Sequence, residues 1–373
     1  MIYLDSAATT FQKPPDVAAA MVDALQTMSS PGRGGHPLAM HAADTTFFCR
    51  NEIADLFHAE SPEQVIFTHN ATHGLNIAIK TLVPRGGRVV ISGYEHNAVT
   101  RPLAALHAQI YVANAPLFQP EAVWKAFDAL IQPGIDAVIC NHVSNVFGFV
   151  QPVEQIADIC RARNVPFIID ASQSAGILPL SLARTGASFI AMPGHKGLYG
   201  PQGTGVLLCG SNVTPKTLME GGTGSDSIRQ DMPDFLPDRL EPGTHNMPGI
   251  AGLMAGVRYV RSRGMAILKK EQALCRLAGE QLRGISGLQI YTARNPAVQT
   301  GVISLCHKTK DVETISNELA QHKIAVRSGL HCAPLAHRTA GTLKTGTVRV
   351  SFSDFNTENE ILQFGDTLRQ ILR

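Results

Sequence analysis

The sequence predicts an α/β protein with a mostly parallel, seven-stranded sheet flanked by helices, followed by a smaller C-terminal α/β domain. The chain has 373 residues, which is more than one hydrophobic core usually supports, so about two domains are expected. Short apolar runs alternate with turns and helical patterns between residues 65 and 208, and a different pattern begins near residue 250. Residues 219–247, rich in glycine, aspartate and proline, separate the two regions.

Each apolar run is predicted to form a buried strand, because the runs are short and rich in β-branched residues. Most are followed by a turn and a helical pattern, which is typical of a parallel sheet with helices on both faces. In such a sheet a ligand lies beyond the carboxyl ends of the strands, so polar residues directly after the runs are site candidates. The runs are 65–68, 89–91, 109–112, 137–140, 166–169, 189–192 and 206–208.

The C-terminal region is predicted to be the smaller α/β domain. Its pattern gives a long helical stretch from about 250 to about 283, strands near 288–290 and 302–305, a helix over 311–322, strands near 325 and 348, and a final helix. We expect residues 15–250 to form the large domain, and residues 251–373 together with 1–14 to form the small one.

Composition and cysteine spacing exclude several classes of function. The formal net charge is +2 and no basic run with interleaved aromatic residues occurs, so no nucleic-acid partner is expected. No basic segment leads into an apolar N-terminal stretch, and no apolar stretch of about 18 residues follows, which predicts a cytoplasmic protein without membrane contact. The seven cysteines include no C-x-x-C pair, which argues against a disulfide framework and a zinc site, so no metal is expected.

Three of the predicted strands are followed by residues suited to a polar ligand. Ala71 and Thr72 open the helix after the first run, and a helix N-terminus offers free N–H groups to an anion. His96 follows the second run, where an imidazole can stack on a flat ring or move protons. Asn145 follows the fourth run and offers an amide. Taken alone, each is better explained by a structural role, as an N-cap, a structural histidine or a loop cap.

An acid and an amine follow the fifth and sixth runs. Asp170 stands directly after four apolar residues, and burying a carboxylate implies a cation, a metal or a protonated ring nitrogen beside it, an N-cap being the alternative. Lys196 lies in the glycine-rich segment 193–205, where a desolvated amine could have a lowered pKa and form a Schiff base. The competing phosphate motif, a P-loop, does not occur. Together these residues are the parts of a pyridoxal 5'-phosphate site.

An ordered set of motifs extends from one end of the chain to the other. They are residues 3–10 (YLDSAATT), 33–36 (RGGH), Thr72, Glu95 with His96, 142–145 (HVSN), Asp170 with Gln173, 194–196 (GHK), 243–246 (GTHN), 326–333 (VRSGLHCA) and 347–351 (TVRVS). In this order the motifs resemble the class V, fold-type I family of pyridoxal-phosphate aminotransferases, and within it most closely the cysteine desulfurases and selenocysteine lyases.

The resemblance implies roles for the residues around the cofactor ring. Lys196 would carry pyridoxal phosphate and then move protons at the substrate Cα. Asp170 would keep the pyridine nitrogen protonated, which makes the ring an electron sink. Gln173 would bond the phenolic oxygen, His96 would stack on the ring, and Asn145 would contact both cofactor and substrate.

The resemblance also implies how the phosphate is held. Thr244 would reach the phosphate bound by the partner subunit, which implies a homodimer with shared active sites. Many relatives have serine or threonine where Pro193 stands, so this phosphate cup must lack one donor or recruit another. The residues expected to hold the phosphate from the same chain are Ala71, Thr72 and His195.

The substrate end is implied by residues close to the C-terminus. Arg349 would clamp the substrate carboxylate, where a planar guanidinium suits bidentate pairing, with Asn145 assisting, Ala8 lining the pocket and Arg327 near the substrate. Cys332 matches the nucleophile that accepts sulfur as a persulfide while alanine is released. Adjacent His331 and nearby Arg327 are expected to favour its thiolate. A structural cysteine or a poor two-residue metal site would be the alternative.

The resemblance therefore implies a pyridoxal-phosphate-dependent cysteine desulfurase. A selenocysteine β-lyase that forms alanine and selenide, another class V enzyme such as a transaminase, and a non-catalytic binding module are the alternatives. The segment around Cys332 is short, which is typical of relatives that depend on an accessory sulfur-acceptor protein or prefer selenocysteine.

Overall fold

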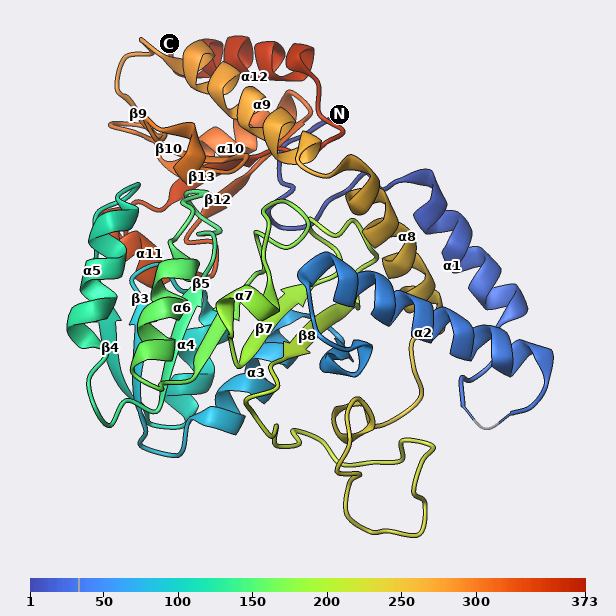
Figure 1. The fold of residues 1–373 in the computed structure, drawn as a ribbon. Coiled ribbons are helices and arrows are strands. Elements are labelled where there is room, and N and C mark those ends of the chain that lie inside the picture. Colours follow the sequence, from blue (N-terminus) through green and yellow to red (C-terminus); the bar gives the residue numbers. More distant parts are fainter. Residues whose placement is uncertain (33) are drawn as a thin grey trace.

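A computed structural model describes residues 1–32 and 34–373; Arg33, the first residue of the 33–36 motif, lies outside the described residues. The large sheet lies at the centre of the protein, and the smaller domain packs at one end, where both termini are found (Figure 1). The expected seven-stranded sheet is confirmed. In spatial order its strands are β2 (Val65–Thr68), β8 (Gly205–Cys209), β7 (Phe189–Pro193), β6 (Phe167–Asp170), β5 (Ala137–Asn141), β3 (Arg88–Ser92) and β4 (Gln109–Ala113).

One strand departs from the parallel arrangement. β8 runs antiparallel to both of its neighbours, β2 and β7, whereas β7, β6, β5, β3 and β4 are parallel to one another. Antiparallel strands can be joined by a short connection, whereas parallel strands need a crossover of a dozen or more residues, usually a helix. The link from β7 to β8, residues 194–204, contains no helix, so β8 returns beside β7 in the opposite direction.

The sheet separates two hydrophobic cores, because successive side chains of a strand point to opposite faces. In β6, Ile168 packs into one core and Ile169 into the other. The first core contains α3 (Ala71–Leu82) and α4 (Asn97–Ala105). The second contains residues of α2 (Pro37–Phe57), α5 (Pro120–Leu130), α6 (Val153–Ala162), α7 (Leu182–Thr185) and α8 (Met247–Arg263).

The predicted long helical stretch is in fact two helices, α8 and α9 (Ala266–Leu282). Gly264 ends α8 with a φ of 50°, a backbone conformation that disfavours a side chain. α8 packs on α1 (Pro15–Thr27) and α2, and its Leu253 and Val257 belong to the second core of the large sheet. We therefore propose that the domain division lies near Gly264, at the end of α8.

The smaller domain has a four-stranded antiparallel sheet in the order β12-β13-β10-β9. Its hydrophobic core lies between this sheet and the helices packed on it, and it includes Leu4 from the N-terminal segment. The short strands β1 (Ile2–Tyr3) and β11 (Ile324–Ala325) pair in parallel. The other elements are β9 (Leu288–Tyr291), β10 (Val302–His307), α10 (Val312–Gln321), β12 (Arg327–Gly329), α11 (Pro334–Thr339), β13 (Thr347–Ser351) and α12 (Glu358–Ile371), with short 3-10 helices at Pro62–Gln64, Asp238–Leu240 and Pro296–Val298.

Two further features bear on function. No helix within the described ranges is both long and apolar enough to cross a membrane. Residues 219–247 project from the large domain, with one 3-10 helix along their length (Figure 1).

Candidate active site

The carboxyl ends of β5, β6 and β7 and the N-termini of α3 and α4 border one cleft. The cleft has a cavity volume of about 110 Å³. Of the residues predicted for the cofactor, it brings together all except Thr244, which lies elsewhere. The residues it shares with the prediction are Ala71, Thr72, His96, Asn145, Asp170, Gln173, His195 and Lys196.

Lys196 lies in the turn that follows β7, and its side chain lines the cleft. Burial lowers the pKa of its amine to about 8, and the nearby positive charge of Arg349 adds to the effect. An amine with a lowered pKa is neutral, and so nucleophilic, in a larger fraction of molecules near neutral pH. Lys196 is therefore suited to covalent attachment of a carbonyl compound.

Asp170 ends β6 and is only 4% exposed. Its Oδ1 accepts a hydrogen bond from the backbone amide of Ser172 at 2.9 Å, and no ion pair to Asp170 is recorded among the described residues. A buried carboxylate without a cation calls for a positive partner from a ligand. A protonated ring nitrogen of a bound cofactor is one such partner. No cluster of three or more potential metal ligands occurs in the part of the chain described.

The N-terminus of α3 forms one wall of the cleft. Asn70 caps this helix, and its Oδ1 accepts from the amide of His73 at 2.9 Å. The N-cap alternative therefore applies to Asn70, while Ala71 and Thr72 present the first turn of the helix to the cleft. Such a helix end attracts anions through its free N–H groups and its dipole.

Pro193 ends β7, and His195 lies in the turn that follows it. Burial, aided by the positive charges of Lys196 and Lys13, lowers the pKa of His195 to about 4. His195 is therefore neutral at physiological pH, with Nδ1 3.0 Å from the Oγ1 of Thr9. Pro193 cannot donate a hydrogen bond, but the side chains of Thr72 and Ser172 line the same cleft.

His96 is both a helix cap and a cleft residue. Its Nδ1 accepts from the backbone amide of Ala98 at 3.0 Å at the start of α4. This bond makes Nε2 the protonated nitrogen of the neutral ring. Burial lowers the pKa of His96, so a flat, neutral imidazole lines the cleft.

Arg349, on β13, is 2% exposed and is held by two partners. Its guanidinium donates to the backbone oxygen of Asn145 at 3.0 Å and to Oδ1 of Asp5 at 2.8 Å. The Nε of Arg349 and the Oδ1 of Asn145 are buried without a recorded partner among the described residues. Because buried polar groups in folded proteins are nearly always paired, these two atoms mark where a polar ligand fits.

Two other residues predicted for the substrate are placed less directly. Arg327 lies on β12 directly opposite Arg349 in the strand register and is exposed. Ala8 is not among the residues that line the cleft. Its neighbour Ala7 reaches the cleft indirectly, because the backbone oxygen of Ala7 accepts from Nε2 of Gln173 at 2.9 Å.

Cys332 is the one exposed cysteine of the chain. It lies in the loop after β12, where His331 and Cys332 have φ values of 50° and 55°. Two successive non-glycine residues in the left-handed region store backbone strain, which is characteristic of functional loops. The loop is tied to the cleft, because Asn97 donates its amide to the Cys332 oxygen at 2.8 Å and Asn145 donates Nδ2 to the His331 oxygen at 2.8 Å.

His331 does not place a positive charge beside the Cys332 thiol. His331 is 6% exposed, and its Nε2 contacts the backbone oxygen of Thr347 at 3.1 Å. Burial, with the positive charge of Arg349 adding, lowers the pKa of His331 to about 2. The ring is neutral at physiological pH, so Arg327 is the remaining predicted cation.

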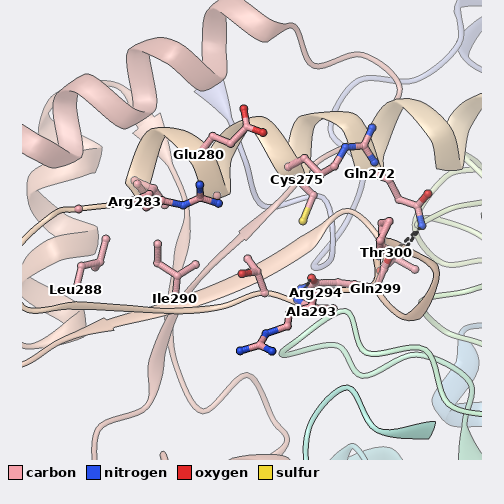
Figure 2. A pocket seen from close by; sticks show the side chains of 16 residues that line it. Gln272, Cys275, Glu280, Arg283, Leu288, Ile290, Ala293, Arg294, Gln299 and Thr300 are labelled. Atoms are coloured by element: carbon pink, nitrogen blue, oxygen red, sulfur yellow. Dashed lines mark hydrogen bonds between the residues drawn. The ribbon is translucent and has the colours of Figure 1, made fainter.

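Thr244 lies outside the cleft. It is exposed in the segment before α8, where it borders hollows shared with Glu241 and His245. A separate hollow in the smaller domain, between α9 and β9, is lined by Cys275, Leu288 and other residues (Figure 2). None of the predicted site residues lies in that hollow.

Glu95, Asp5 and Lys13 were not predicted as site residues. Glu95 is fully buried and bonded to the backbone of Asn141, which lines the cleft. Asp5 and Lys13 contact Arg349 and the backbone of His195. The sequence offered two signals, namely a charged residue, Asp5, in the motif 3–10 and another, Glu95, directly before His96. Neither signal identifies the residue that the side chain contacts.

The chain is similar to known proteins over almost its whole length. The family model described as Aminotransferase class-V matches residues 2–364. A probable cysteine desulfurase of Pyrococcus abyssi is 30% identical, with 100% of this chain and 94% of the relative covered. One of Methanothermobacter thermautotrophicus is 31% identical over 99% of this chain and 94% of its own length. The apo structure of a cysteine desulfurase from Thermococcus onnurineus NA1 superposes with a TM-score of 0.91 at 29% identity, covering 100% of this chain and 94% of that one.

Proposed function

Because the chain belongs to the class V aminotransferase family, whose members use pyridoxal phosphate, we propose that it is a cysteine desulfurase. It would convert L-cysteine into L-alanine and transfer the sulfur to Cys332. The names of the relatives support this activity. The observation that carries it is the exposed thiol of Cys332, in a strained loop bonded to Asn97 and Asn145 at the cleft.

The cleft residues fit the cofactor. Pyridoxal phosphate supplies, when bound, a carbonyl for an amine and an electron sink for bonds at the substrate Cα. Lys196 would hold it and move the proton at Cα, and the unpaired carboxylate of Asp170 would keep a proton on the pyridine nitrogen. Gln173 and His96 would orient the ring, and the first turn of α3 with His195 would bind the phosphate.

The substrate would be bound by the two unpaired polar groups beside the cleft. The Nε of Arg349 would donate to the substrate carboxylate, while Asp5 and the Asn145 oxygen hold the rest of the guanidinium in place. The unpaired Oδ1 of Asn145 would accept from the substrate. Both groups are buried, so a bound amino acid excludes water from them.

The thiolate of Cys332 would then attack the substrate sulfur. An S–S bond forms, the substrate Cβ–S bond breaks, and Cβ gains a proton, so cysteine and the Cys332 thiol together yield alanine and a Cys332 persulfide. The reaction balances without an external oxidant. Because Cys332 is exposed, an accessory acceptor protein or a thiol could take the sulfur from it.

A homodimer with shared active sites is part of this proposal. Thr244 is exposed and lies outside the cleft of its own chain, which supports its contact with the phosphate of a second copy. Large apolar side chains on α1, on α2 and in the projecting segment support a partner surface, since Leu25, Phe47 and Ile228 are 72%, 55% and 94% exposed.

The proposal is tested by following both products from L-cysteine. We expect equal amounts of alanine and of sulfide released by a reductant, and no oxo acid, which a transaminase would form. Lys196→Ala should abolish turnover and covalent cofactor attachment, measured by mass spectrometry after borohydride reduction. Alanine formation without persulfide, or turnover in Lys196→Ala, would contradict the proposal.

A further inference from the structure

The segment from Asp5 to Lys13, between β1 and α1, contacts three separate parts of the candidate site. Its first residue, Asp5, binds the guanidinium of Arg349 at 2.8 Å. The backbone oxygen of Ala7 accepts from Gln173 at 2.9 Å. Its last residue, Lys13, donates from Nζ to the backbone oxygen of His195 at 3.0 Å. We call residues 5–13 the N-terminal strap.

The strap supplies every recorded hydrogen bond to the His195 carbonyl within the described residues. Besides Lys13, the donors are the amide of Thr10 at 3.2 Å, its Oγ1 at 3.0 Å and the Oγ1 of Thr9 at 3.3 Å. The Oγ1 of Thr10 also lies 3.3 Å from the Lys196 oxygen. The turn is also closed by its own backbone, since the amide of Tyr199 donates to the Lys196 oxygen at 2.9 Å and the amide of Gly194 donates to the Thr204 oxygen at 2.8 Å. The strap adds the hydrogen bonds to the carbonyl directly before Lys196.

Lys13 is placed unusually for a lysine. It is half-buried, and no carboxylate pairs with it in the ranges that the structure covers. Burial lowers the pKa of its amine to about 8. The Lys13 amine exchanges water for the His195 carbonyl and the Thr10 hydroxyl, and it gains no ion pair within the described residues. It therefore loses solvation that a structural lysine on the surface would keep. The hydrogen bond that fixes the His195 carbonyl offsets the free-energy cost of this lost solvation.

We propose that the N-terminal strap is a positioning element that joins the substrate-binding arginine to the cofactor-binding lysine, and that Lys13 is its positioning residue for Lys196. The inference rests on the proposed function, because it takes Lys196 as the cofactor lysine. Lys13 does not line the cleft. It acts through the backbone of His195 and Lys196 rather than by touching cofactor or substrate.

The test compares the holoenzyme with Lys13→Met, which keeps the length of the side chain but removes its donors. Lys80→Met, on the exposed side of α3, is the matched control. We measure the loss of protein-bound visible absorbance after free cofactor is removed, together with kcat and KM for cysteine. A misplacement of the lysine backbone by a fraction of an ångström should speed cofactor loss and lower kcat, each about 10-fold, with KM changed by about twofold or less.

The outcomes separate this inference from the proposed function. If Lys13→Met matches Lys80→Met in both cofactor loss and kcat, the inference is overturned, while turnover of cysteine by the unchanged enzyme still stands. If the unchanged enzyme does not turn over cysteine, the rate of cofactor loss still decides the role of Lys13. If Lys13→Met fails to fold, Thr10→Val is tested in its place, because it removes one donor to the same carbonyl. Its rate of cofactor loss and its kcat should each change about threefold, and values equal to those of Lys80→Met would overturn the inference.

Discussion

The carboxyl group of Glu95 accepts a hydrogen bond from the backbone amide of Asn141, 2.8 Å away. Asn141 lies beside Asp170 in the register of β5 and β6. Ser92 donates a second hydrogen bond to the same oxygen of Glu95, at 2.6 Å, and the other oxygen has no recorded partner among the described residues. A fully buried carboxyl group is thus built into the strand ends that carry the candidate site.

We expect Glu95 to make stability fall as pH rises. Burial, with the negative charge of Asp170 adding, raises the pKa of Glu95 to about 8, from an ordinary value of 4.5. The unfolded chain therefore releases this proton at a lower pH than the folded chain does, and between about pH 4.5 and 8 the free energy of unfolding falls. Glu95→Gln should remove roughly 1 to 4 kcal/mol of that fall.

The measurement is denaturant unfolding at pH 5 and at pH 8 for both proteins. Glu280→Gln, an exposed glutamate on α9, is the control and should leave the difference unchanged. Glu271 is also buried with a raised pKa, so only the change between variants is interpreted. An identical pH dependence in Glu95→Gln would show that Glu95 is ionised in the folded protein.

Arg349→Lys should weaken substrate binding more than it slows turnover. A lysine cannot supply the unpaired Nε together with the donors that hold Asp5 and the Asn145 oxygen. Loss of a hydrogen bond to a charged group costs about 1.5 to 3 kcal/mol, so KM for cysteine should rise about 10- to 100-fold. Arg283→Lys, an exposed arginine of the α9 to β9 hollow, is the matched control. An unchanged KM in Arg349→Lys would place the carboxylate elsewhere.

Cys332→Ala should lose nearly all turnover of cysteine while it retains turnover of selenocysteine. Sulfur must be extracted by a nucleophile, because a thiol is a poor leaving group, whereas a selenol is more acidic and its bond to carbon is weaker. Alanine formation from each substrate is the measurement, and Cys306→Ala, at a half-buried cysteine, is the control. Full activity of Cys332→Ala on cysteine would mean that this thiol is not the acceptor.

Thr244→Ala should weaken cofactor binding although Thr244 lies outside the cleft of its own chain. A lost hydrogen bond to phosphate would raise the dissociation constant about 10-fold. Mixing this variant with Lys196→Ala should restore one tight site per hybrid dimer, because the intact threonine of one subunit then serves the intact lysine of the other. If the mixture binds cofactor only as the average of the two separate variants, the site is not shared between subunits.

The sequence was sufficient to predict the strands of the large sheet and most of the residues that line the cleft. Buried parallel strands are continuous apolar runs, and residues such as Asp170 and Lys196 follow them directly. The direction of β8 could not be read from its composition, because an apolar run looks the same in either direction. The neutrality of the His331 ring could not be predicted either, because it follows from burial against Thr347 and Arg349, which are distant in sequence.

Residues that act through long-range contacts were likewise beyond sequence reasoning. The ion pair of Asp5 and Arg349 joins residues 344 positions apart, and a single sequence carries no signal for such a pair. The break at Gly264 between α8 and α9 was missed for a different reason. Both sides of it continue the same helical pattern, and glycine inside a helix is tolerated often enough to be ambiguous.

The pairing of β1 with β11 and of Asp5 with Arg349 means that residues synthesised early close onto residues synthesised much later. A nascent chain that has emerged as far as β8 already contains Lys196, Asp170 and every strand of the large sheet. Residues 2–5 must nevertheless wait, unpaired, for β11 and β13. The substrate end is therefore completed only after β13 has emerged, and a chain terminated before β13 would keep Lys196 but lack Arg349, the residue proposed to hold the substrate carboxylate.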